Sequence, residues 1–426
     1  MAVIRKPRIT KLGRAFNQLW YSSFAGHISA GILVTAGPLL ATRLTQDPVL
    51  IAGTAALSTL PWLLFGVVIG GLLDRVNRRR ALAAATAVEL LGSAVVSLAL
   101  ATGQMSIWVL YVVSFVVGTA GVVADTATQS MVPKLLKAEH IESGNARLNM
   151  TQTTLQSFVG TPLGSLLYAS ALWLPFFISS IGYLFAAAFL VFIPKAVAQV
   201  WDATSADSNR DASKPRTKFW EDVKFGVVYL YRDKPLLRLV ITTAIIGFFF
   251  AVSSATAILF MLNVAHVPEA GYGLVLTTQG IASIFGAMHA TWWSRKFGRG
   301  LVLGWAIIVP TATTIGMAFT TEPVGLVLLM MLNGYAISMW NIHLMSTYHE
   351  LIPNELFGRI HGTRRTLVWG LMPIGNMVGG WLATYSLQLP LLLGGILGTA
   401  VAIQGFGFIR RLATAASVPV AKTPQS

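Results

Sequence analysis

Side chains able to carry a proton inside long apolar stretches are the first candidates for chemistry in this 426-residue sequence. Glu89 lies well inside the apolar run 81–101, and His27 lies in the middle of the run 16–40. An ionisable group in a membrane span is costly and is by default a functional candidate. Each could carry a coupling proton. Each could instead be a packing residue, with Glu89 protonated or paired against a neighbouring helix and His27 hydrogen-bonded.

Two glutamines add hydrogen-bonding capacity to a later apolar stretch. Gln152 and Gln156 are four residues apart, so on a helix they share one face. That face could present amide groups to a small molecule or could hydrogen-bond neighbouring helices, and the sequence leaves both functions open. With His27 and Glu89, these two residues are the candidates for coupling and substrate binding.

Catalytic and cofactor chemistries have no support in the residue patterns. No Gly-x-x-x-x-Gly-Lys-Ser/Thr phosphate loop occurs, so ATP-driven transport within this chain is not expected. Histidines do not cluster at metal-ligand spacing, and the absence of cysteine excludes disulfides and thiolate metal sites. We therefore expect no enzyme activity, no metal and no cofactor.

The elements that must position these residues are membrane-spanning helices. Of the residues, 54% are hydrophobic and 11% are charged, whereas a soluble domain averages about 25% charged residues. The apolar runs reach the length of about 20 residues that a helix needs to cross a bilayer, so we expect an all-α polytopic membrane protein with twelve transmembrane helices. The expected spans are residues 16–40, 50–72, 81–101, 106–129, 148–170, 173–193, 237–262, 272–293, 301–319, 323–345, 363–385 and 390–409.

The spans form two sets of six separated by a polar stretch. We expect an N-terminal six-helix bundle over residues 1–193, a cytoplasmic linker over 194–236, and a C-terminal six-helix bundle with a short cytoplasmic tail over 237–426. Residues 218–235 of the linker form an amphipathic segment before the seventh span. A repeat of six spans around a central linker is a transporter arrangement, with the substrate site between the halves.

Basic residues determine the expected orientation. The formal net charge is +15, but the basic residues are scattered among loops without a basic–aromatic module, so nucleic-acid binding is not expected. With both termini inside, Arg43 alone of the 31 Lys and Arg residues falls in an outer loop. Because positive residues near helix ends are retained in the cytoplasm, the sequence predicts a multi-pass protein of the cytoplasmic membrane with both termini cytoplasmic.

A tight basic loop between the second and third spans carries the most specific motif. It reads Gly70-x-x-x-Asp74-Arg75-x-Asn77-x-Arg79-Arg80. The motif resembles the loop between helices 2 and 3 of major facilitator superfamily transporters, with Asn77 where that family has Gly. Because Asn tolerates a left-handed backbone, we expect the turn to form despite this departure.

The resemblance implies that this loop acts as a cytoplasmic gate. It implies that Asp74 approaches the start of span 11, where backbone N–H groups favour an anion. An arginine of the loop can also reach Asp125 at the inner end of span 4, which by analogy is a gate partner. The alternative is that these charges only set the topology and hold the helices together.

Four stretches are similar to one branch of that family, the enterobactin-exporter and macrolide-efflux type. They are Arg14–Pro38, Asp74–Arg80, Glu221–Leu237 and Pro353–Gly380. The similarity implies a monomeric exporter of drug, macrolide or siderophore-like small molecules, driven by the proton motive force through alternating access. Many drug–proton antiporters carry an arginine in span 4, which Trp108–Gln129 lacks. An importer of the same fold, a non-transporting receptor and, with least support, a membrane-embedded enzyme are the alternatives.

Small residues and prolines in spans 5 and 11 form a further pattern that the two halves share. They are Gly160, Pro162 and Gly164 in the first half and Pro373, Gly375 and Gly379 in the second. Glycines four residues apart allow close contact between membrane helices, and a proline within a helix causes a kink. We therefore expect these residues to form helix contacts and kink sites.

The gate role of Asp74 can be tested by replacing its carboxylate with an amide. Because the loop lies at the membrane surface, we expect Asp74→Asn to fold normally but to lower transport by at least about tenfold, within the range of typical coupling between sites. The measurement is transport rate per folded protein. Unchanged transport would leave the loop with a topological role only.

Overall fold

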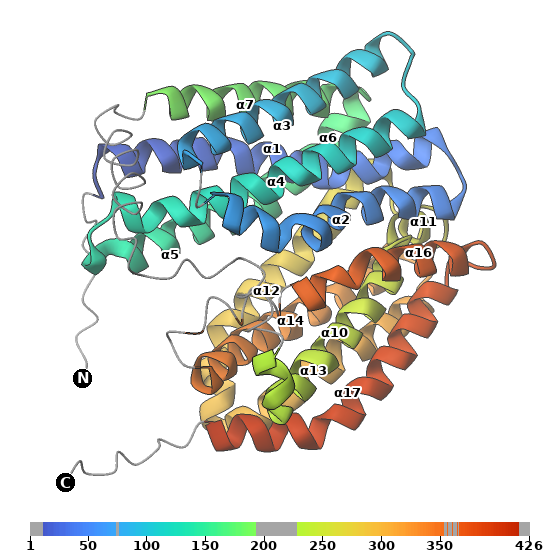
Figure 1. Cartoon of the computed structure of the whole chain (residues 1–426). Coiled ribbons are helices and arrows are strands. Elements are labelled where there is room, and N and C mark those ends of the chain that lie inside the picture. The colour runs from blue at the N-terminus through green and yellow to red at the C-terminus, as the bar shows by residue number, and fades with distance from the viewer. Residues whose placement is uncertain are drawn as a thin grey trace.

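The structure is a computed structural model in which the described chain is helical and contains no strands (Figure 1). It describes residues 12–73, 76–192, 228–352 and 366–416, together with residues 356, 360 and 364. Asp74, Arg75 and residues 194–227 of the expected linker over 194–236 lie outside these residues, so the gate loop and that part of the linker stay predictions. The described end of the linker is helical over 228–232, and the next helix begins at Lys234. The expected spans all coincide with helical passes, and the all-α fold class is confirmed.

The first half contains six passes, of which the fifth is made of three successive helical segments. Its helices are α1 (Arg14–Leu44), α2 (Pro48–Leu73), α3 (Arg78–Ala101), α4 (Ile107–Leu135), α5 (Ile141–Gln152), the π-helix η2 (Thr153–Gly160), α6 (Thr161–Ser170) and α7 (Leu174–Val191). A short 3₁₀ turn, η1 (Ala138–His140), precedes α5.

The second half repeats the pattern of six passes, of which the first is made of α10 and α11. Its helices are α10 (Lys234–Ser254), α11 (Ala257–Asn263), α12 (Glu269–Phe297), α13 (Arg299–Met317), α14 (Pro323–Leu351), α16 (Met372–Ala383) and α17 (Leu389–Ala416). The start of α1 and the end of α17 lie at one end of the molecule, which we call the proximal end (Figure 1). The connection between α1 and α2 lies at the opposite, distal end.

Three of the passes are less apolar or less continuous than the others. Nine described helices are long and apolar enough to cross a membrane, and the three remaining passes are the broken fifth pass, α12 and the pass containing α16. All three pack where the halves meet, α6 against α12 and α16 against α2. Their small and polar residues therefore face protein, where close backbone contact replaces the lipid contact of an ordinary span.

The halves are joined at the distal end. One buried apolar cluster there combines both halves and includes Leu39 of α1 with Phe260 of α11. The other buried clusters in the described chain each lie within a single half. Two polar contacts also cross this distal seam: Ser165 Oγ donates to Ala270 O at 3.0 Å, and Arg43 pairs with Glu269 at 3.3 Å.

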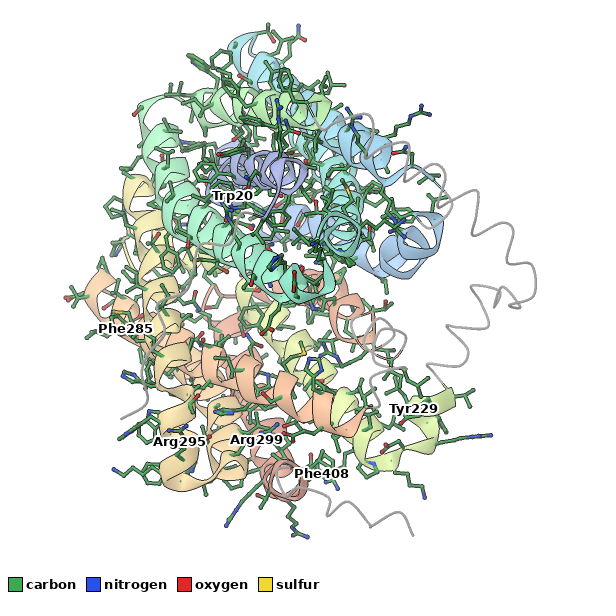
Figure 2. The ribbon with its side chains drawn as sticks, turned by 90° about the vertical axis from the view of Figure 1, so that its left-hand side faces the viewer. Trp20, Tyr229, Phe285, Arg295, Arg299 and Phe408 are labelled. Atoms are coloured by element: carbon green, nitrogen blue, oxygen red, sulfur yellow. The ribbon has the colours of Figure 1, made fainter. Side chains whose placement is uncertain are left out.

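At the proximal end, the described polar contacts fasten each half to itself. Figure 2 shows Trp20 in the first half and Arg299 in the second. Trp20 Nε1 donates to Thr151 Oγ1 at 2.7 Å and so links α1 to α5. The Arg299 guanidinium, at the start of α13, lies 2.5 Å from the carboxylate of Glu350 near the end of α14. These two contacts each join helices of the same half.

Glycines allow the close approach at the distal seam. A Cβ at Gly273 of α12 would lie 2.3 Å from Thr161 O of α6, and a Cβ at Gly380 of α16 would lie 2.5 Å from Ala52 Cβ of α2. Both distances are far below van der Waals contact, so any larger side chain would force the two halves apart.

The glycines expected to make helix contacts are also packed against backbone, within one half. A Cβ at Gly160 would lie 2.7 Å from Gly31 Cα, and one at Gly164 would lie 2.3 Å from Ile32 O, both on α1. In the second half, the same construction at Gly375 and Gly379 reaches backbone carbonyls of α10, at 2.6 and 2.2 Å.

Proline distorts the fifth pass differently from a simple kink at Pro162. The distortion is the π-helix that precedes it, in which Thr161 N–H bonds to Gln156 O, five residues back. Because Pro162 has no N–H, the carbonyl four residues earlier loses its helical partner, and the backbone widens there. Thr161 Oγ1 also donates to Gln156 O, at 2.8 Å.

Asn77 does not use the left-handed backbone that asparagine tolerates. Asn77 has φ −68° and ψ 110°, which is extended, and its side chain accepts a hydrogen bond from Arg80 N. It is therefore the N-cap of α3, a position that asparagine favours because its side chain satisfies a free N–H of the first turn.

The seam glycine Gly273 provides a test of this packing. We expect Gly273→Leu to destabilise the protein by about 1–3 kcal/mol, the usual cost of overpacking, because its side chain meets α6 backbone. Thermal unfolding of the purified protein measures this. Gly407→Leu is the matched control, since nothing lies within 4 Å of a Cβ at Gly407. Equal melting temperatures for the two variants would contradict the close seam.

Candidate functional site: a cavity in the first half

A cavity opens inside the first half because α1 stands apart from two of its neighbours. α1 packs extensively on α6 and α7, but only lightly on α2 and α4. The space between them consists of an inner chamber of about 460 Å³ and an outer chamber of about 350 Å³. The outer chamber reaches toward the proximal end, where Asn145 of α5 and Gln129 of α4 line it.

The two chambers share part of their walls. Glu89 of α3, Tyr183 of α7, Gln156 of η2 and the pair Gly118 and Gly121 of α4 line both. Because the two chambers share these residues, they adjoin one another, and Glu89 belongs to the wall that they share.

The cavity brings together most of the candidate residues of the sequence analysis. His27, Gln152 and Asp125 line the outer chamber, in addition to Glu89 and Gln156. The two glutamines therefore line a cavity, as required by the alternative in which their amide groups bind a small molecule. Gln156 lies on the widened turn of the π-helix. Turns of this kind are often found at functional sites.

Glu89 lies on α3 and lines both chambers. A Cβ at Gly121 of α4 would lie 3.9 Å from Glu89 Oε1, and no other atom lies that close to it. Because Gly121 has no side chain, α4 does not cover the carboxyl. In the part of the chain that the structure describes, the Glu89 carboxyl makes no hydrogen bond or ion pair.

Asp125 lies on α4 nearer the mouth of the cavity. Gln129 Nε2 donates to both of its carboxylate oxygens at 3.1 Å, so the acid is held on its own helix. Arg78 reaches the same helix at a different place, where its guanidinium donates to Ser130 O at 3.1 Å. Arg78 therefore caps the backbone of α4. The expected contact between an arginine of the loop and Asp125 stays a prediction.

Another loop arginine fastens the end of α7. Arg79 donates to Leu190 O and to Val191 O, both at 3.0 Å. Cations favour the C-terminal end of a helix because its last carbonyls lack partners. For Arg79 the geometry favours the alternative that the loop charges hold helices together, while Arg80 is exposed. Gly70 lies in the last turns of α2.

Several aromatic residues of the wall were not singled out from the sequence. Phe176 lines the inner chamber, and Trp62 of α2 with Trp369 of the second half lines the outer one. The rings of Trp62 and Trp369 are 5.5 Å apart between centroids. Aromatic residues are common in membrane spans, so no sequence signal separated these from lipid-facing ones.

The lining favours a mostly apolar ligand with a few polar groups. In the part of the chain that the structure describes, no lysine or arginine lines either chamber. Among the described residues, no group of three or more His, Asp or Glu side chains could hold a metal ion. The chemistry available is therefore hydrogen bonding by amides, contact with aromatic rings, and charge from carboxyls and His27.

Comparison with known proteins was made against families, curated sequences and solved structures. A family model described as Major Facilitator Superfamily matches residues 19–374. No curated protein sequence matches the chain.

Solved transporter structures share the fold at low sequence identity. The nucleoside transporter NupG has a TM-score of 0.70 at 13% identity, covering 93% of this chain and 99% of that chain. A peptide transporter POT in complex with sulfate has a TM-score of 0.69 at 12% identity, covering 94% of this chain and 96% of that chain. A bacterial homologue of the iron transporter ferroportin, in an inward-facing state, has a TM-score of 0.68 at 15% identity, covering 92% of this chain and 98% of that chain. Such likenesses show the fold alone.

Access to the cavity can be measured because the chain has no native cysteine. Ser23 lines the outer chamber, whereas Ser165 is fully buried at the distal seam. We expect a water-soluble maleimide to label Ser23→Cys at least about tenfold faster than Ser165→Cys, since the seam opens only in a minor state. Both replacements keep the side chain small. Equal rates would mean that the distal end is not closed.

Proposed function

Because this chain belongs to the major facilitator superfamily, we propose that it exports amphipathic small molecules across the cytoplasmic membrane by alternating access. The chain is a multi-pass membrane protein and a secondary transporter of the superfamily. The observation that carries the proposal is the cavity, which lies beside the joined distal seam and reaches toward the proximal end. A transporter that alternates must present its site to one side at a time.

The proposed orientation places the proximal end in the cytoplasm. Among the described residues, Arg43 is the only lysine or arginine at the distal end. Positive residues near helix ends are retained inside, so the cavity faces the cytoplasm in this conformation. A cytoplasmic opening is where an exporter takes up its substrate.

The cavity suits a substrate of drug-like size. Ligand sites of this kind usually have about 300–1,000 Å³, and the two chambers have about 460 and 350 Å³. Aromatic and aliphatic walls provide apolar contact, while Gln152 and Gln156 provide amide groups. These features support the class that includes drug-like, macrolide and siderophore-like molecules, as the efflux branch implies.

The proposed energy source is the proton motive force. Glu89 and His27 both line the outer chamber, where a proton could bind in competition with the substrate or beside it. In the proposed cycle, closure of the proximal end brings the loop of Asp74 and Arg75 toward its partners, with Asp125 near the mouth. The distal seam, including the Arg43–Glu269 pair, must then open.

Transport into everted membrane vesicles tests this proposal. Everted vesicles from cells that overproduce the chain should accumulate a fluorescent macrolide or dye when respiration acidifies their interior, and a protonophore should abolish the accumulation. Vesicles from cells without the chain are the control. A growth-inhibition panel with and without overproduction selects the compound. Accumulation only in right-side-out vesicles would make the chain an importer, and accumulation in neither would make it a non-transporting protein.

A further inference from the structure

We propose that the cavity binds a hydrophobic organic cation, such as an apolar molecule with a protonated amine, and that the carboxylate of Glu89 is its counter-ion. The inference rests on the proposed function in using the same cavity, and it names the substrate class. The siderophore-like anions of the efflux branch would then be excluded.

The first observation is a carboxyl without a partner in the wall of the cavity. Glu89 lines both chambers, and among the described residues its carboxyl has no hydrogen-bonding or ionic partner. A carboxylate that is shielded from water and has no partner is strongly unfavourable. Because Glu89 lines both chambers, a ligand within them can supply the missing positive charge.

The second observation is the space in front of this carboxyl. Gly121 places no side chain on the face of α4 opposite Glu89, and the nearest atom to a Cβ at Gly121 is Glu89 Oε1 itself, at 3.9 Å. The rings of Tyr183 and Phe176 line the same inner chamber. Aromatic faces attract cations, so the walls around the carboxyl suit an apolar body that carries a positive charge.

The third observation is the sign of the charge in the cavity. The chain has a net charge of +15, yet no described lysine or arginine lines either chamber, while Glu89 and Asp125 do. His27 is the only other ionisable side chain besides tyrosine in the described lining. A cleft lined by one sign of charge concentrates the opposite sign, so an organic anion would meet two carboxyls and, in the described lining, no fixed cation.

Two probes of the same shape and opposite charge test the proposal. Tetraphenylphosphonium and tetraphenylborate differ little in size, and their equilibrium binding to the purified wild-type protein can be compared directly. We expect tetraphenylphosphonium to bind more tightly. We also expect Glu89→Gln to weaken its binding by at least about tenfold, as loss of one member of a buried charge pair does. Glu322→Gln, at an exposed acid before α14, should bind as the wild type does.

A second variant keeps the test valid if Glu89→Gln does not fold. Gly121→Val retains the carboxylate but places a side chain in front of it, and should weaken cation binding while leaving the melting temperature nearly unchanged. The proposal is overturned if tetraphenylborate binds as tightly as tetraphenylphosphonium, if the wild type binds neither, or if a folded Glu89 or Gly121 variant binds the cation normally. The readout is binding, so failure of export in vesicles would overturn the proposed function alone.

Discussion

Backbone contact between the two halves at one end of the molecule is the constraint on which the rest of the structure depends. α6 meets α12 at Gly273, and α2 meets α16 at Gly380. With no side chain between them, the helices approach closely enough for a shared apolar cluster to form around them. Because dispersion forces act over short distances, this contact holds only where the small residues are. At the proximal end, the described polar contacts fasten each half within itself.

The distribution of charge follows from the same membrane setting. Basic residues are placed at the proximal ends of helices, where arginines such as Arg78 and Arg79 satisfy backbone carbonyls. The spans keep few charges because each is costly in lipid. The result is a chain with a large positive charge whose internal cavity, in its described lining, carries acids and neutral groups but no lysine or arginine. The cost of placing charge in a membrane thus separates the two signs without a dedicated binding motif.

The sequence was sufficient for the passes, because runs of apolar residues have no other use at that length. The halves, as sets of six, followed from the same runs. The departures are local. Asn77 caps a helix because the free N–H groups of the first helical turn need a hydrogen-bond acceptor. Asparagine favours this position as well as left-handed turns. The π-helix before Pro162 could not be predicted, because a missing N–H can be absorbed by a bend or by a wider turn.

Candidate residues in the spans could be identified from the sequence because an ionisable side chain in a membrane is energetically costly. The residues that surround them could not be identified in this way. Glu89 was conspicuous in an apolar run, whereas the side it faces depended on Gly118 and Gly121 of another helix. Trp369 enters the wall from the opposite half, a contact that depends on how the halves meet. Contacts between residues far apart in the sequence are set by packing between helices. Regular apolar runs in a single sequence do not show which helices pack together.

The widened turn of η2 has a mechanical consequence. Below it, α5 is attached to α1 through Trp20 and Thr151, while above it α6 is anchored to α12 in the other half. α6 also packs on α1, so both segments share that helix and are joined by a stretch whose hydrogen bonds are longer-ranged than those of an α-helix. Conversion of this stretch to regular helix would rotate the Gln152 face relative to α6 without altering any residue of the wall.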